Sequence, residues 1–259
     1  MSLAPFAWPG GKRALTKTLL TLIPKHTIYA ELFAGSAKLL FAKEPSKAEV
    51  LNDLSGDVTN FFRVCKHRTA ELAEALAVEC IHAGRFRDLR TEKPECELER
   101  ALRFYYLTRY SFGAKGEHFA MGNATSPKCR PLDQVRELLA ATAARLATVR
   151  IEQQDFAFIL KRYDSAGTFF YLDPPYVEYG ANGRYEPLDE LRREEMFALL
   201  AKLKGKFLLS FDDHPEIRRR AKQYGFRIRE EQVPYSLSAN ADARKKAAEL
   251  LVANYAIAA

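Results

Sequence analysis

The chain has 259 residues, of which 47% are hydrophobic, so it can bury a sizeable core as one large domain or as a domain with an insertion. Forty Lys and Arg residues against 33 Asp and Glu residues give a formal charge of +7, which favours a polyanionic partner. No window approaches the roughly 18 uninterrupted apolar residues of a membrane span, and the N-terminus lacks a signal-peptide pattern, so we expect a cytoplasmic protein without a membrane partner.

The earliest predicted elements lie between Thr27 and Asp53. The segments TIYAELF, AGSAKLLFAKE and AEVLND predict a strand, a turn with a helix, and a second strand. The pattern resumes at Val149 with strands in VRIEQQDF, TFFYLD, KFLLSFDD, FRIREEQV and ELLVANYAI, and with helices in AFILKRYD, LDELRREEMFALLAKLK and PEIRRRAKQYG. Short apolar strands that alternate with helices predict an α/β fold with a mostly parallel, Rossmann-like sheet.

The middle of the chain has little strand pattern. Its spacing of apolar residues predicts helices, with breaks expected at Gly84 and Pro94, and residues 111–131 predict a loop or a short ribbon. The sequence therefore divides into two expected parts. Residues 1–56 and 149–259 form the sheet domain, and residues 57–148 form a largely helical insertion.

Four cysteines are widely spaced and form no CxxC pair: Cys65, Cys80, Cys96 and Cys129. This usage is typical of reduced thiols rather than of a disulfide framework. The histidines near Cys65 complete no quartet at zinc-ligand spacing, so we expect no metal.

A small-residue turn from Ala34 to Ala37 joins the first predicted strand to its helix. Asp53 ends the next strand about 20 residues on, where a carboxylate can bind ribose hydroxyls. Glu31 adds an acid that can pair with an ammonium group. These acids suit a cationic nucleoside ligand without phosphates, although the turn alone is equally explained as a tight strand–helix connection.

The segment WPGGK, from Trp8 to Lys12, lacks the glycine spacing, the hydroxyl residue and the preceding strand of a phosphate-binding loop. One interpretation is a lid in which Trp8 packs on a ligand and Lys12 meets the carboxylate of that ligand. The alternative is an N-terminal coil that Trp8 anchors.

Several motifs coincide along the chain: FAWPGGK, AELFAGSAKLLFAK, LNDLSGDVTNFFR, QDF and YLDPPY. Together they resemble the Dam-type DNA adenine-N6 methyltransferase family, which uses S-adenosyl-L-methionine and has a class I methyltransferase-like sheet. The resemblance implies methylation of the N6 amino group of adenine in double-stranded DNA by base flipping, with target recognition in the insertion. It also implies that the following residues bind the cofactor: Trp8, Lys12, Glu31, Phe33, Gly35, Asp53, Asp155, Phe156 and Asp173.

The chain departs from the family pattern at several positions. Leu32 stands where the family usually has proline, and Ala37 stands where it usually has glycine. The segment RYSFGAKGEHF echoes the family's recognition segment without its asparagines, so the DNA sequence that this chain recognises is left open. Similar proteins occur in phages, in restriction–modification systems with a partner endonuclease, and in housekeeping methylation.

The segment DPPY follows the strand Thr168–Leu172 and predicts the catalytic residues. Two acceptors, the Asp173 carboxylate and the Pro174 carbonyl, can bind both hydrogens of an exocyclic amine and so localise its lone pair. The prolines fix the backbone and preorganise these acceptors. Tyr176 offers a ring on which a flipped base can stack.

Basic residues in two segments are candidate DNA contacts. Around the insertion loop they are Arg109, Lys115, Lys128 and Arg130, and before the last strand they are Arg244 and Lys245. The second group is equally explained as a solvated sheet edge. Arg218 to Arg220 lie on a predicted surface helix, and we expect them to face solvent.

Two rival functions remain. Cytosine-N4 transfer uses similar active-site chemistry, although WPGGK favours adenine. A catalytically silent nucleic-acid-binding module of the same fold would not need Lys12, Asp53, Asp173 and Tyr176 together.

Overall fold

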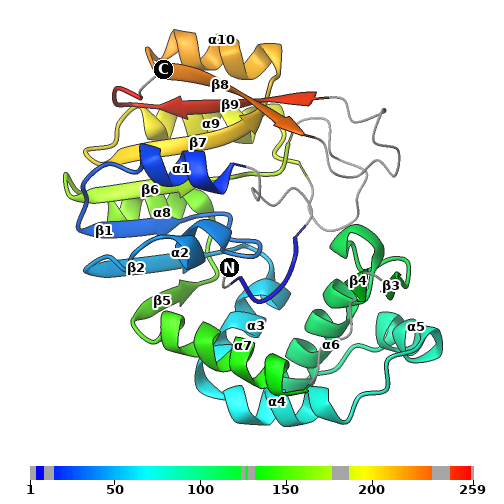
Figure 1. The fold of residues 1–259 in the computed structure, drawn as a ribbon. Helices are drawn as coiled ribbons and strands as arrows, with labels where there is room; N and C mark the ends of the chain where they lie inside the picture. Colours follow the sequence, from blue (N-terminus) through cyan, green and yellow to red (C-terminus); the bar gives the residue numbers. More distant parts are fainter. Residues whose placement is uncertain are drawn as a thin grey trace.

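A mostly parallel sheet carries the fold. Its strands lie in the order β5 (Val149–Glu152), β2 (Ala48–Asn52), β1 (Ile28–Glu31), β6 (Thr168–Leu172), β7 (Lys206–Asp212), β9 (Lys246–Ala253), β8 (Arg227–Pro234) (Figure 1). The computed structural model describes residues 4–8, 15–123, 126–127, 132–176, 187–234 and 246–257. Strands β5, β2, β1, β6 and β7 pair in parallel, whereas β9 runs antiparallel to both β7 and β8.

The sheet topology confirms the predicted fold class. When β9 is set aside, the remaining strands follow the spatial order 3-2-1-4-5-6, which is the order of a doubly wound dinucleotide-binding sheet. The chain moves from β1 outward to β5 and then returns to β6 beside β1. The order of the strands therefore reverses between β1 and β6, and ligands of such sheets bind at this point.

Helices cover both faces of the sheet (Figure 1). On one face lie α8 (Phe156–Tyr163), α9 (Glu190–Leu200) and α10 (Pro215–Gln223), which share a core cluster with Phe170 and Leu172 of β6. On the other lie α1 (Thr16–Leu22) and α2 (Lys38–Ala42), which share a cluster with Phe169 and Tyr171. All five residues of β6 are buried, and four of them are aromatic or aliphatic.

Between β2 and β5 the chain is largely helical. Its elements are α3 (Gly56–His67), α4 (Thr69–Ala77), α5 (Ala83–Thr91), α6 (Glu97–Arg109), the 3-10 turn η1 (Phe112–Ala114), β3 (Gly122–Asn123), β4 (Ser126–Pro127) and α7 (Leu132–Leu146). Phe61, Phe104 and Leu139 belong to the same core cluster as Tyr29 of β1. The helical segment therefore shares its core with one face of the sheet.

In three places the local structure differs from the predictions. Helix α1 was not predicted, because its short span carries no clear start signal. Gly84 lies inside α5 rather than between helices, since the ring of His82 accepts a hydrogen bond from Arg85 N at 3.2 Å and starts the helix there. Arg220 is 3% exposed rather than solvated, because it forms ion pairs with Glu216 of its own helix and with Glu190 and Glu194 of α9.

Candidate functional site

Acidic side chains stand at the carboxyl ends of neighbouring parallel strands. Glu31 ends β1, Asp53 follows β2, Asp155 comes shortly after β5, and Asp173 follows β6. Because parallel strands end at the same edge of a sheet, these acids lie along one crevice. Glu31 and Asp173 flank the point where the strand order reverses, and the charge of Asp173 acts on Glu31.

Asp53 fixes the turn that follows β1. Its Oδ2 accepts a hydrogen bond from Gly35 N at 2.8 Å, and its Oδ1 accepts one from Ser55 N at 2.9 Å. Gly35 has a φ of +48°, a conformation that glycine adopts without strain. Ala37 also has a positive φ, +53°, which explains why glycine is preferred at this position of the turn.

Asn52 is a positioning residue that the sequence analysis missed. Its amide nitrogen donates to Leu32 O at 2.9 Å and to Gln154 O at 3.0 Å, and its Oδ1 accepts from Gln154 N at 2.9 Å. These bonds tie together the ends of β1, β2 and β5, from which the crevice acids project. An asparagine directly before the acid that ends a predicted strand was the available signal in the sequence.

Trp8 lies against the Gly35 turn. A Cβ atom placed on Gly35 would lie 2.6 Å from Cδ1 of Trp8, so the indole ring occupies the space that a side chain would need. Trp8 also packs on Phe6 and Phe104, with ring centroids 5.7 and 5.8 Å away. The residue expected to act with it, Lys12, lies outside the described residues.

This contact predicts the effect of Gly35→Ala. The new methyl group would collide with the indole, and the positive φ would add strain, so we expect the free energy of unfolding to fall by about 1–3 kcal/mol. Since Trp8 is the only tryptophan of the chain, its fluorescence should shift as well. Gly225→Ala is the matched control, because Gly225 has a φ of +70° and nothing within 4 Å. An unchanged emission spectrum in Gly35→Ala would contradict the contact.

Glu31 is a buried carboxyl group that is 3% exposed. Its Oε2 accepts hydrogen bonds from Tyr29 OH at 2.8 Å and from Leu40 N at 3.0 Å. Burial raises the pKa of Glu31 to about 8 in spite of these bonds, and the negative charge of Asp173 adds to the rise. A cationic ligand beside Glu31 would pair with the ionised carboxylate and so lower the pKa of Glu31 again.

Phe33 and Phe156, two of the residues expected to bind the cofactor, form an aromatic layer. The rings of Phe33 and Phe156 are 6.0 Å apart, and the guanidinium of Arg192 lies 4.5 Å from the centre of the Phe156 ring. Asp155 caps α8 by accepting from Ala157 N at 2.8 Å and also forms an ion pair with Arg192. No sequence pattern pointed to Arg192, since it lies on another helix.

Leu54 is a second residue that the sequence analysis missed. It follows Asp53 directly and is 66% exposed, although a leucine is usually buried. An exposed apolar side chain beside a strand-end acid is a suitable contact for the face of an aromatic ligand.

The DPPY segment continues β6 into the crevice. Asp173 is half-buried, Pro174 is buried, and Tyr176 packs on the sheet with its ring 5.8 Å from that of Phe211. Burial raises the pKa of Tyr176 well above its usual value, and the charges of Asp173, Glu249 and Asp212 raise it further. The phenol is therefore neutral at physiological pH and acts as a hydrogen-bond donor.

Of the predicted DNA contacts, the structure describes Arg109, at the end of α6, and Lys115, which follows η1. A hollow of about 290 Å³ is lined by Trp8 and Ser55 on one side and by Lys115 of this loop on the other. Phe112 of η1 is 60% exposed and was not predicted as a contact. The other predicted contacts lie outside the described residues: Lys128, Arg130, Arg244 and Lys245.

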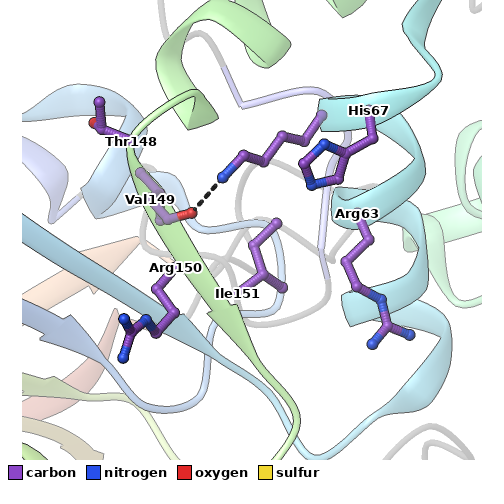
Figure 2. Close-up of a pocket in the computed structure, with 7 residues that line it drawn as sticks. Arg63, His67, Thr148, Val149, Arg150 and Ile151 are labelled. Atoms are coloured by element: carbon purple, nitrogen blue, oxygen red, sulfur yellow. Dashed lines mark hydrogen bonds between the residues drawn. The ribbon is translucent and has the colours of Figure 1, made fainter.

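A second hollow, of about 380 Å³, lies at the outer edge of β5 and is away from the crevice acids. Lys66 of α3 donates to Val149 O at 2.8 Å there (Figure 2). The head groups of Arg63 and Arg150 point in different directions in Figure 2, and Arg150 donates to Tyr163 OH at 3.2 Å. The basic side chains do not converge on one point, so we interpret them as protection of the sheet edge.

In the described parts of the chain, no helix is long and apolar enough to cross a bilayer. Nor do those parts contain a group of three or more His, Cys, Asp or Glu side chains arranged to hold a metal ion.

The strand order and the crevice at the reversal point define a Rossmann-like α/β protein of the class I methyltransferase type. Residues 8–236 match the family model of the D12 class N6 adenine-specific DNA methyltransferases, and the chain belongs to this family. It is 24% identical to the DNA adenine methylase of Salmonella typhi, over 94% of this chain and 92% of that protein. It is also 24% identical to the Type II methyltransferase M.MjaIII of Methanocaldococcus jannaschii, over 98% and 100% of the two chains.

Proposed function

We propose that the chain methylates the N6 amino group of adenine in double-stranded DNA, with S-adenosyl-L-methionine as the methyl donor and the target base flipped out of the duplex. Membership of the D12 class supports the reaction. The observation that carries the proposal for this chain is the position of Asp173, Pro174 and Tyr176, which follow β6 beside Glu31 at the point of strand reversal.

The charges of the crevice are complementary to those of S-adenosyl-L-methionine. The ligand carries two cationic centres, an ammonium and a sulfonium, and the crevice presents Glu31, Asp53 and Asp173. Glu31 would pair with the ammonium group, whereas Asp53, whose oxygens can each accept more than one hydrogen bond, would bind the ribose hydroxyls. The apolar surfaces that would hold the adenine are Leu54 and Phe156, with Phe33 beside them. When bound, the cofactor supplies an electrophilic methyl group on a positively charged sulfur.

The chain activates the amine of the substrate by positioning two acceptors. The adenine N6 lone pair is delocalised into the ring and is a weak nucleophile. The Asp173 carboxylate and the Pro174 carbonyl would each accept one N6 hydrogen, which favours a localised lone pair on the nitrogen. The half-buried Asp173 carboxylate would also accept the proton that the methylated amine releases.

Tyr176 would hold the flipped base. Extrusion of a base from the duplex costs a few kcal/mol, and stacking of the extruded base on an aromatic ring offsets about 1–3 kcal/mol of this cost. The ring lies beside Asp173 and is packed on Phe211, so it can align the adenine plane with the two acceptors.

The helical part, residues 57–148, would recognise the DNA target. Arg109 at the end of α6 and Lys115 after η1 flank the exposed Phe112, and this arrangement combines cations for phosphates with an aromatic ring for base contact. Lys128, Arg130, Arg244 and Lys245 would add phosphate contacts.

The pKa of Glu31 predicts a pH dependence of cofactor binding. A carboxyl group with a pKa of about 8 is mostly protonated below that pH, and it must ionise to pair with an ammonium. We therefore expect the Kd for S-adenosyl-L-methionine to fall as the pH rises from about 6 to 7.5, by up to about tenfold per pH unit. Calorimetry on Glu31→Gln should show weaker binding with a flatter slope. An equal slope in that variant would assign the dependence to another group.

The proposed reaction is tested by incubating duplex DNA of mixed sequence with the chain and S-adenosyl-L-methionine that carries a labelled methyl group. Digestion to nucleosides and chromatography should place the label on N6-methyladenine. Label on N4-methylcytosine would overturn the choice of base. Binding of DNA without any labelled nucleoside would instead identify a catalytically silent binding module.

A further inference from the structure

Strand β9 brings a late residue of the chain into the crevice. Because β9 runs antiparallel to β7, its first residues lie beside the carboxyl end of that strand. Glu249 is the register partner of Asp212, the last residue of β7, and Asp213 N donates to Ala248 O at 3.2 Å. The carboxylate of Glu249 therefore joins the acids at the ends of the parallel strands.

Glu249 contacts the tyrosine of the DPPY segment directly. The hydroxyl oxygen of Tyr176 lies 2.7 Å from Oε1 and 2.8 Å from Oε2 of Glu249, so its single proton is shared between the two oxygens. Glu249 is only 7% exposed, which shields this bond from water.

The contacts with Glu249 and Phe211 define the plane of the phenol ring. Phe211 is fully buried on β7, and its ring is inclined by 29° to that of Tyr176. Tyr176 itself follows the end of β6 and lies outside any helix or strand. The hydroxyl contact at one end of the ring and the stacking contact on its face hold the side chain in one orientation.

We propose that Glu249 is a positioning residue for methyl transfer: it binds the hydroxyl of Tyr176 and fixes the ring beside Asp173 before the target base arrives. This inference rests on the proposed function, in which Tyr176 stacks on the flipped adenine. Preorganisation of this kind removes the cost of ordering the side chain during the reaction.

A double-mutant cycle with Glu249→Ala and Tyr176→Phe tests the inference, because phenylalanine keeps the ring and removes only the hydroxyl. Each single variant should lower the single-turnover rate of methylation by about tenfold, the size expected for a hydrogen bond to a charged group. The double variant should be no slower than either single variant. The Kd for S-adenosyl-L-methionine should stay within about twofold of wild type in all three, as expected when the base side of the site alone is affected.

Multiplying effects in the double variant, or a Glu249→Ala variant as fast as wild type, would overturn the inference. If Glu249→Ala does not fold, Glu249→Gln replaces it, since glutamine keeps the volume and one acceptor. Its smaller loss of rate should also vanish in the Tyr176→Phe background, and a loss that persists there would overturn the inference equally.

Glu231→Ala is the matched control. Glu231 lies opposite Glu249 on the neighbouring strand β8, but its carboxylate accepts from Arg229 at 2.6 Å. Its loss should leave the rate within about twofold of wild type, as for most substitutions outside a site. A wild-type chain that methylates no adenine would refute the proposed function instead, so the two failures are distinguishable.

Discussion

Replacement of Asp173 by alanine should nearly abolish methyl transfer while the fold survives. The variant loses the side-chain acceptor for the amine and keeps only the main-chain acceptor at Pro174. Removal of one preorganised hydrogen-bonding group typically costs roughly 10²–10³-fold in rate, so we expect the single-turnover rate to fall by about that factor. Circular dichroism should report a folded chain.

The amide variant separates charge from geometry at this position. Asp173→Asn keeps an acceptor oxygen but removes the negative charge, so its rate should lie between those of wild type and Asp173→Ala. Glu137→Ala, an exposed position on α7, controls for a general loss of negative charge. Turnover near the wild-type rate in Asp173→Ala would contradict the role proposed for this carboxylate.

The crevice could be predicted because its main acids follow local patterns. The predicted strands before Asp53 and Asp173 are short apolar runs that stop at a polar residue, and parallel strands place their ends along one edge. Asp53 and Asp173 were found in this way from sequence alone. The Gly35 turn was found because a run of small residues between a strand and a helix is typical of a close approach to the backbone.

The contacts between distant segments could not be predicted in this way. The antiparallel direction of β9 depends on how the chain returns after α10 and β8. The pattern of residues within the strand does not indicate this direction. The pairing of Tyr176 with Glu249 follows from that direction, across a sequence separation of 73 residues. Arg220 resembled a surface charge because its partners on α9 come together with it only when α9 and α10 pack.

The attachment of the helical segment to the sheet also depends on a long-range contact. Glu49 of β2 is 1% exposed at its side chain and accepts from Lys43 at 2.5 Å and from Arg145 of α7 at 2.5 and 3.0 Å. Arg145 also donates to Leu40 O at 2.9 Å. One buried carboxylate therefore joins β2, the segment after α2, and the last helix of the insertion.

Glu49→Ala should lower the free energy of unfolding by about 3–5 kcal/mol, because it leaves the buried cations of Lys43 and Arg145 without their shared counter-ion. Burial alone would raise the pKa of Glu49, but the hydrogen bonds from Arg145 and Lys43 outweigh it, so the pKa lies below its usual value. The stabilisation is therefore present above the pKa of the unfolded carboxyl group and is lost as the pH falls through the lower folded value. Urea titrations should show that the free energy of unfolding of Glu49→Ala is well below that of wild type at neutral pH, and that this difference becomes smaller at acidic pH. The exposed control Glu44→Ala should have nearly the wild-type free energy of unfolding at either pH. A Glu49→Ala midpoint equal to that of Glu44→Ala at neutral pH would mean that the apolar core alone holds the helical segment to the sheet.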